Sequence, residues 1–283
     1  MPKRPLLLLS TAALILLNAA VWAFLAWPRE RTLTVSFLDI GQGDSIFIRG
    51  PTGREVVVDG GPDRSVLREL PKVMGPLDRS IDLVVETHPD ADHITGLTYV
   101  LDRYAVGAFM DPDRPDDTQV SKTLMADVAK EPGATRVIGR AGERIDLGGG
   151  AYADVLSPSG DVSQIPTNNG SIVMRVVYGD TSFMLTGDAP SPIEDYLVGK
   201  YGAALKTDVL KAGHHGSKYS TDDLWLATVA PAVVVISAGK DNSYGHPNPE
   251  TISRIENEGA HIVSTIDKGT ITFTSDGKEI AER

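Results

Sequence analysis

The hydrophobic pattern divides the chain into an apolar N-terminal segment and a longer part in which strand-like and helix-like stretches alternate. Residues 5–27 carry no charged side chain, and an alternation of apolar and polar residues begins near Leu33. Short apolar, β-branched runs bounded by Gly, Pro, Asn or Asp are typical of strands. They predict strands over residues 34–40, 45–49, 55–58, 81–87, 142–145, 151–156, 172–177, 181–185, 207–212, 232–237, 261–265 and 269–274.

Helical patterns lie between these strands. The predicted helices cover residues 64–75, 94–102, 121–129, 192–201, 221–228 and 248–259. In the last of them Asn248 is a suitable N-cap and Pro249 a suitable first residue. Strand-then-helix order in both halves of residues 33–283 predicts an α/β protein, a layered sandwich of two sheets with helices outside.

The N-terminal segment has the length of a membrane span. Lys3 and Arg4 precede the uncharged run, and Trp22 and Trp27 lie toward its far end. Eighteen or more apolar residues can cross a bilayer as a helix, and the positive flank places residues 32–283 on the extracytoplasmic side. We therefore expect a single-pass membrane anchor within residues 1–30. The alternative is a cleaved signal peptide, with Val21-Trp22-Ala23 as the cleavage site and a secreted product.

Composition narrows the chemistry. The 283 residues contain no cysteine, which excludes disulfides and a thiolate zinc site. The net charge is −11, and residues 1–31 carry four basic and one acidic side chain, so residues 32–283 carry −14. Such a domain is a poor general binder of nucleic acid, which needs a basic surface. Lysines at 200, 206, 211 and 218 form either a solvated face or a substrate-facing patch.

The sequence His-Pro-Asp-Ala-Asp-His at residues 88–93 holds four potential metal ligands: His88, Asp90, Asp92 and His93. Imidazole and carboxylate groups bind zinc, manganese or iron. The cluster follows the apolar run 81–87 directly, so it lies where a buried strand ends. A polar loop without a metal is the alternative, but only six histidines occur in the chain and two of them are here.

Other predicted strands also end in polar residues. Asp59 follows strand 55–58, Asp188 follows 181–185, the pair His214-His215 follows 207–212, and His246 follows 232–237. Active sites of α/β sheets favour the carboxyl ends of strands, so we expect these residues to meet the cluster at 88–93. We expect one histidine of the pair to face the metal. Alternatives are a turn role for Asp59, a helix cap for Asp188 and a loop role for His246. His261 opens a strand, and we interpret it as structural.

Taken together, these motifs resemble the metallo-β-lactamase superfamily and, more narrowly, its ComEC-type competence-protein branch. The resemblance rests on Asp59-Gly60-Gly61, residues 88–93, Thr186-Gly187-Asp188 and Gly213-His214-His215-Gly216-Ser217. Supporting matches are residues 37–44, residues 168–173, Ser237-Ala238-Gly239 and Tyr244-Gly245-His246-Pro247. The motifs span residues 35–247, nearly the whole predicted domain.

The resemblance implies an αββα sandwich with one or two divalent metal ions. His88 and Asp90 would hold the first ion, Asp92 and His93 the second, and Asp188 would bridge both. His215 or His214 would complete the second site, and Asp59 and Asn168 would support the ligands. Asp90 and Asn168 stand where many superfamily members have histidines, and ComEC-type members often share both replacements. Oxygen ligands favour a harder metal, so we expect manganese to compete with zinc.

The expected function is that of a membrane-anchored, exported, metal-dependent hydrolase that activates a water. Asp92 or Asp188 would orient the water, while His246, Lys218 and Ser217 would hold an anionic oxygen of the transition state. The resemblance implies a phosphodiester substrate, such as single-stranded DNA in competence-type processing. Alternatives are a lactone or phosphocholine-type ester hydrolase, or a non-catalytic partner of a membrane channel. ComEC proteins carry a multi-span channel region that this sequence lacks, so we expect any channel to be a separate protein.

Overall fold

The computed structural model describes residues 11, 13–19, 22 and 31–283. The chain divides into two units, residues 1–31 and residues 32–283. The predicted span over residues 5–27 falls largely outside the described residues, so the anchor stays a prediction. Residues 13–19 are helical, but no helix within the described ranges combines the length and apolar character that crossing a bilayer requires.

The second unit alternates strands and helices along the chain. Its strands are β1 (Leu33–Phe37), β2 (Ile46–Arg49), β3 (Glu55–Val58), β4 (Ser80–Ile81), β5 (Leu83–Val85), β6 (Ala105–Val106), β7 (Ala108–Asp111), β8 (Thr135–Ile138), β9 (Arg144–Gly148), β10 (Ala151–Ser157), β11 (Val173–Tyr178), β12 (Thr181–Leu185), β13 (Val209–Lys211), β14 (Val233–Ile236), β15 (His261–Ser264), β16 (Ile271–Ser275) and β17 (Ile280–Glu282). Its α-helices are α2 (Val66–Met74), α3 (Ala91–Arg103), α4 (Gln119–Val128), α5 (Ser191–Tyr201), α6 (Asp223–Val229), α7 (Pro249–Asn257) and α8 (Thr265–Lys268). Short 3-10 turns are η1 (Asn168–Gly170), η2 (Gly202–Leu205) and η3 (Gly213–Gly216).

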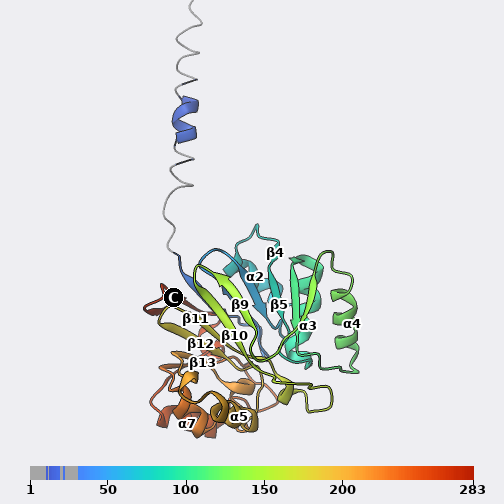
Figure 1. The fold of residues 1–283 in the computed structure, drawn as a ribbon, viewed down its shortest axis with the longest axis vertical. Helices are drawn as coiled ribbons and strands as arrows, with labels where there is room; N and C mark the ends of the chain where they lie inside the picture. The colour runs from blue at the N-terminus through green and yellow to red at the C-terminus, as the bar shows by residue number, and fades with distance from the viewer. Residues whose placement is uncertain (1–10, 12, 20–21, 23–30) are drawn as a thin grey trace, which may run out of the picture. The chain divides into compact units, whose positions relative to one another are not determined.

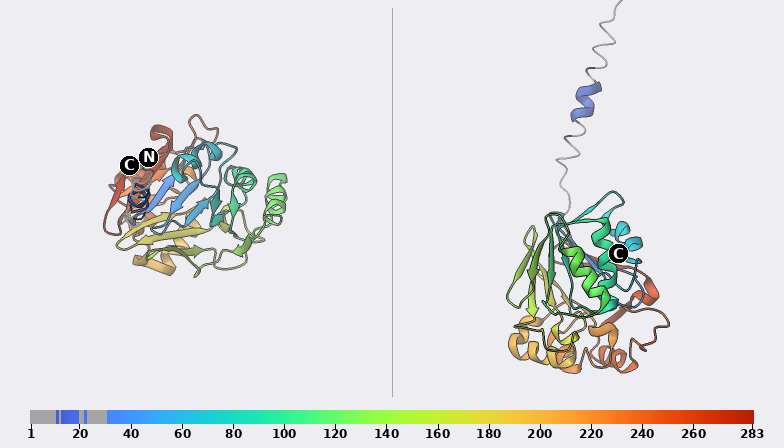
Figure 2. Two further views of the ribbon diagram at one scale, coloured as in Figure 1. Left: turned by 90° about the horizontal axis from the view of Figure 1, so that it is seen from above. Right: turned by 90° about the vertical axis from the view of Figure 1, so that its right-hand side faces the viewer.

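Two mixed sheets form the centre of this unit. One has the order β17-β16-β1-β2-β3-β5-β7-β8, and the other has the order β15-β14-β13-β12-β11-β10-β9. Figure 2 shows the sheets lying face to face between helices. Apolar residues of α2, α3 and α4 pack on the first sheet, and those of α5, α6 and α7 pack on the second. Figure 1 shows α3 and α4 side by side. The predicted αββα sandwich is therefore confirmed.

Alternate side chains of each strand pack against the other sheet and against the outer helices, so both faces of each sheet are buried. In β3, Val56 and Val58 point between the sheets, whereas Val57 packs with the helices outside. Successive side chains of a strand point to opposite faces, so a strand covered on both sides is apolar throughout. The same division holds in β5, where Val84 faces the helices and Val85 the centre.

The carboxyl ends of several strands meet at one edge of each sheet. β3, β5 and β7 run parallel in the first sheet, and β12, β13, β14 and β15 run parallel in the second. Loops that follow these strands therefore leave from the same edge, as the polar residues after the predicted strands indicated.

Some predicted boundaries were wrong. The strand predicted over 81–87 divides into β4 and β5 at Asp82, whose carboxylate accepts a hydrogen bond from the Glu55 amide at 2.7 Å. Strands β6, β7, β8 and β17 were not predicted. β8 is largely exposed and lies at a sheet edge, so its sequence lacks the apolar run of a central strand.

Candidate metal centre

A loop and the first turn of a helix present the cluster at residues 88–93. His88 lies in the loop after β5, and α3 begins at Ala91 rather than at the predicted residue 94. Asp90 occupies the N-cap position with extended backbone, yet its carboxylate makes no capping hydrogen bond. Asp92 and His93 stand in the first helical turn. The helix start thus divides the cluster into a loop pair and a helix pair.

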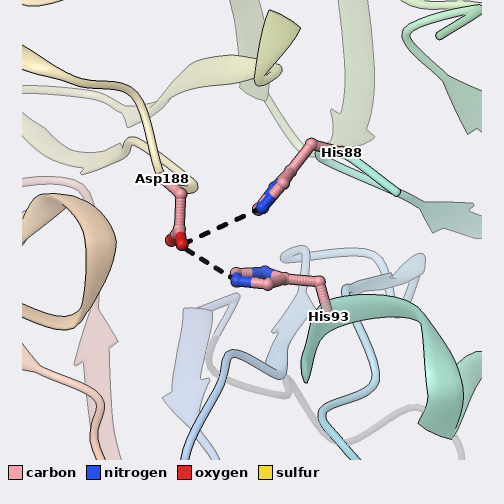
Figure 3. Close-up of side chains that lie close together, drawn as sticks. All are labelled: His88, His93 and Asp188. Carbon is pink, nitrogen blue, oxygen red and sulfur yellow. Dashed lines mark ion pairs between the residues drawn. The ribbon is translucent and has the colours of Figure 1, made fainter. Parts of the chain in front are cut away.

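The carboxylate of Asp188 lies at the centre of four imidazole rings. Its Oδ1 is 3.4 Å from Nε2 of His93, and its Oδ2 is 3.5 Å from Nε2 of both His214 and His215. Nε2 of His88 lies 3.9 Å from Oδ2. Figure 3 shows the rings of His88 and His93 directed at this carboxylate. The separations are long for a direct hydrogen bond but near the about 3.3 Å expected between two ligands of a tetrahedral zinc ion.

Two groups of ligands share Asp188. On one side, Asp90 Oδ2 lies 3.6 Å from His88 Nε2. On the other, Asp92 Oδ2 lies 3.4 Å from His215 Nε2. The ligand atoms of Asp92, His93 and His215 lie within 4.8 Å of one another, as do those of His88, His93 and Asp188. The arrangement has room for two neighbouring cations.

Several buried polar atoms of this cluster lack a hydrogen-bond partner among the described residues. They are the Nε2 atoms of His88, His93 and His215 and the Oδ1 atom of Asp188. Burying a polar atom without a partner costs about 1–3 kcal/mol. These atoms belong to overlapping groups of converging ligand atoms, so divalent cations bound there would satisfy them. The donor set of imidazoles and carboxylates therefore fits a divalent metal.

The outward-facing ring nitrogens are held by neighbouring groups. His93 Nδ1 lies 2.8 Å from Asp59 Oδ2, and His215 Nδ1 lies 2.9 Å from the Ser237 carbonyl oxygen, which can only accept. Thr87 donates its hydroxyl to Asp59 at 2.7 Å, so its oxygen accepts from His88 Nδ1 at 3.0 Å. A histidine whose Nδ1 donates keeps the Nε2 lone pair for a metal. Asp59 therefore does more than form a turn, because it orients His93.

Both histidines of the adjacent pair face Asp188. The expectation that one of them faces the metal stays a prediction. His214 and His215 lie in η3 with φ of 48° and 57°. Two consecutive residues in the left-handed region do not send their side chains to opposite sides as an extended strand would.

Asn168, in η1, places its amide nitrogen 3.4 Å from His214 Nδ1. Asp188 does not cap the helix that follows it, since Pro190 holds the N-cap position of α5.

Lys211 and Asp44 belong to the centre and were missed by the sequence reasoning. Lys211, in β13, is fully buried and forms an ion pair with Asp44. Its Nζ also donates to the Gly187 carbonyl at 3.0 Å and lies 3.7 Å from Asp188 Oδ1. Lys211 is thus neither on a solvated face nor in a substrate-facing patch. Lys211 interrupts the apolar run of residues 209–212. This position could have indicated a buried lysine with an acidic partner, because lysine is almost never buried unless it is paired.

The charges in the cluster are strongly coupled. Burial alone would raise the pKa of Asp188, but the rings of His215 and His93 outweigh it and hold that pKa well below the usual value. Burial opposes the ionisation of Asp92 too, yet the neighbouring rings of His215 and His93 lower its pKa to about 2. Burial disfavours protonated His93 and His215, but the charge of Asp188 raises both pKa values well above normal. Without a metal, protons on these rings balance the carboxylates.

An open hollow of about 410 Å³ leads to the centre. Its lining includes Asp90, Asp92, Asp116 and the exposed Tyr244. Tyr244 is stacked on His246 with ring centroids 6.1 Å apart, and the His246 ring lies 5.4 Å from that of His214. His246 is therefore close enough to the centre to contact a bound substrate.

The side chains of two residues expected to hold an anionic oxygen contact Tyr219. Ser217 is buried, and its hydroxyl oxygen accepts from the Tyr219 amide at 3.3 Å. Lys218 is exposed, with Nζ 5.0 Å from the centre of the Tyr219 ring. No ion pair joins Lys218 to the carboxylates of the centre in the part of the chain that the structure describes.

The αββα sandwich with histidines and aspartates at the ends of its strands defines a class of metal-binding proteins. The chain belongs to the metallo-beta-lactamase superfamily, whose sequence profile matches residues 38–240. This confirms the family that the sequence motifs indicated.

Particular relatives place the chain near competence proteins. It is 30% identical over 260 residues to ComE operon protein 3 of Bacillus subtilis, and 29% identical over 245 residues to competence protein ComA of Neisseria gonorrhoeae. These matches cover 84% and 86% of this chain but 32% of each relative, so the chain spans about a third of their length. Igni18, a metallo hydrolase of Ignicoccus hospitalis, superimposes with a TM-score of 0.57 at 17% identity, covering 86% of this chain and 98% of that one. That likeness shows the fold alone.

Proposed function

We propose that residues 33–283 form a metal-dependent hydrolase that cleaves phosphodiesters. The observation that carries the proposal is the convergence on the Asp188 carboxylate of three buried Nε2 atoms that have no hydrogen-bond partner within the described part of the chain. His88, Asp90 and His214 would hold one divalent ion, and Asp92, His93 and His215 the other, with Asp188 between them. Such ions supply a Lewis acid and lower the pKa of a water to near neutrality.

The chain's own residues would position the reaction. Asp92 has a side chain 27% exposed, so its carboxylate can orient an attacking water at the rim of the hollow. Burial lowers the pKa of His246, which leaves the ring neutral at pH 7 and able to donate an N–H to an anionic oxygen. We therefore favour His246 over Ser217 and Lys218 for that role.

A phosphodiester, with single-stranded DNA as the polymer we favour, is supported by two lines of evidence. The relatives include proteins named for competence, and the exposed Tyr244 ring lies at the hollow where a base could stack. The charge of −14 on residues 32–283 opposes broad DNA affinity, so binding would depend on the metal ions. The mixed set of imidazole and carboxylate ligands suits zinc or manganese.

The first test is an activity screen of the full chain. Purified protein would be supplied with manganese or zinc and given bis-p-nitrophenyl phosphate and single-stranded DNA. We expect hydrolysis of both, and a loss of at least about 100-fold in Asp188→Asn, since a shared ligand is removed. Hydrolysis of a lactone or phosphocholine ester but of no phosphodiester would contradict the proposed substrate. Unchanged activity in Asp188→Asn would contradict the metal centre itself.

We also propose that residues 1–30 anchor the domain in the cell membrane and hold it on the extracytoplasmic side, beside a separate channel protein. The supporting observation is the uncharged run of residues 5–27 behind Lys3 and Arg4. Extraction with sodium carbonate and protease protection in intact cells would test this. Release of the protein as a shortened soluble form would favour the cleaved signal peptide instead.

A further inference from the structure

A second cavity lies next to the candidate metal centre, on the helix side of the first sheet. It measures about 260 Å³ and is lined by residues that include Glu86, Asp111, Pro115, Ser121, Met125 and Arg136. Asp116 lines both this cavity and the hollow above the metal ligands, so the two spaces share a wall. The hollow and the cavity therefore adjoin each other at Asp116.

Glu86 places a carboxyl group in this cavity that has no hydrogen-bond partner within the described part of the protein. The residue is only 4% exposed, yet no group among the described residues makes a hydrogen bond with its carboxyl. Its acidic neighbours are already paired, because Arg136 donates to both oxygens of Asp111 at 2.6 and 2.7 Å and to Asp113 at 2.8 Å. The Glu86 carboxyl lines the cavity, so it can form hydrogen bonds with the N–H groups of a ligand there.

The position of Glu86 relates the cavity to the metal ligands. Glu86 and His88 are two residues apart, so their Cα atoms lie at most about 7 Å from each other. One nucleotide unit is long enough to place a phosphate at the ligands and its base in the cavity. Met125 and Pro115 offer apolar contact to a flat ring, and carboxylates accept hydrogen bonds from exocyclic amino groups of bases.

We propose that this cavity binds an amino-bearing nucleobase of the substrate strand, with the base N–H groups donating to Glu86. The proposal rests on the proposed phosphodiesterase function and extends it from the phosphate to the base. It makes Glu86 a specificity residue that touches substrate, whereas the metal ligands act on the phosphodiester.

The test measures binding of a base without its phosphate, so the result is independent of metal and hydrolysis. Full-length, metal-free protein would be titrated with deoxycytidine, thymidine and 2-deoxyribose and followed by nuclear magnetic resonance. We expect deoxycytidine to bind at least tenfold more tightly than 2-deoxyribose and more tightly than thymidine, which has no amino group. Glu86→Leu should remove the difference, and Glu86→Gln, which keeps an acceptor oxygen, should retain most of it.

Two further variants distinguish a specific loss of deoxycytidine binding from the effects of misfolding. Met125→Trp fills the cavity from α4 and should also abolish deoxycytidine binding, while the exposed Glu256→Leu should bind as the unaltered chain does. Equal binding of deoxycytidine and 2-deoxyribose, or unchanged deoxycytidine binding in both Glu86→Leu and Met125→Trp, would overturn the proposal. If the base binds as expected but bis-p-nitrophenyl phosphate is not hydrolysed, the proposed phosphodiesterase function fails while the base site stands.

Discussion

At the scale of single residues, the centre is built from groups that hold one another in place. Asp59 accepts hydrogen bonds from the Thr87 amide at 2.8 Å and from its hydroxyl, and its Oδ2 also meets His93 Nδ1. Its buried position lets one carboxylate orient two neighbours. Removing the charge while keeping the shape should therefore weaken metal binding without dismantling the site.

We predict that Asp59→Asn lowers affinity for manganese or zinc about 10- to 100-fold, the range found for residues that orient metal-bound histidines. Isothermal titration calorimetry on the full chain would measure this. Asp63→Asn, an exposed aspartate in the following turn, is the matched control and should leave affinity unchanged. Equal affinities for the Asp59 and Asp63 variants would show that Asp59 has no orienting role.

Lys211 is a second residue whose effect can be isolated. Its ammonium group is buried with Asp44 and lies near Asp188, so it balances carboxylates that have no access to water. We predict that Lys211→Met lowers the free energy of unfolding of the metal-free protein by about 3–5 kcal/mol, because a buried charge loses its partner. Lys206→Met, at an exposed site, should change it by less than about 0.5 kcal/mol. Urea unfolding would compare them, and a loss of under 1 kcal/mol for Lys211→Met would contradict this role.

At the scale of elements, one buried carboxyl of α5 holds the turn that begins α6. Glu194 accepts hydrogen bonds from the amides of Thr221 at 2.8 Å and Asp222 at 3.3 Å. Burial is the main cause that raises the pKa of Glu194 to about 8, and it outweighs these two amides. The neutral form is thus favoured in the folded protein, and the connection between the two helices depends on pH.

Because the folded pKa of Glu194 exceeds its unfolded value, its contribution to stability is complete below about pH 4.5 and is lost as pH rises through about 8. We predict that the free energy of unfolding of the unaltered protein declines across this window more steeply than that of Glu194→Gln, which keeps an acceptor oxygen but cannot ionise. Denaturant unfolding at pH 5 and pH 8.5 would measure the difference. Parallel pH profiles for the two proteins would refute the assignment.

At the scale of the whole molecule, the two sheets bring the ligands together from opposite halves of the chain. His88 and His93 follow β5 of the first sheet, and Asp188, His214 and His215 follow β12 and β13 of the second. A cation bound between them would link the sheets, so metal binding should stabilise the entire sandwich. The raised pKa values of His93 and His215 mean that binding must displace protons.

We predict that manganese or zinc at about 100 times its dissociation constant stabilises the fold by about 2.7 kcal/mol. For a domain of this size the melting temperature should rise by about 5–10 °C. At one fixed metal concentration the rise should be larger at pH 8 than at pH 6, because protons compete with the metal. Calorimetry with and without chelator would measure it, with Asp188→Asn as the comparison. A metal-induced rise of equal size in Asp188→Asn would place the binding elsewhere.

The sequence by itself determined the sandwich and most of the candidate ligands. Apolar strands buried on both faces must be nearly continuous in hydrophobic residues, and polar residues that follow them must lie at a sheet edge. His88, Asp90, Asp92, His93 and Asp188 could be named on that basis. The exposed edge strand β8 was missed because few of its side chains are buried.

Only the tertiary structure decided how these residues share the centre. The left-handed turn of η3 turns both His214 and His215 toward Asp188, which no strand periodicity predicts. Asp44 and Lys211 are 167 positions apart, and their ion pair forms because the two sheets pack face to face. Local patterns record which residues are polar and where elements end. The pairing of buried charges depends on distant segments that meet only in the folded chain.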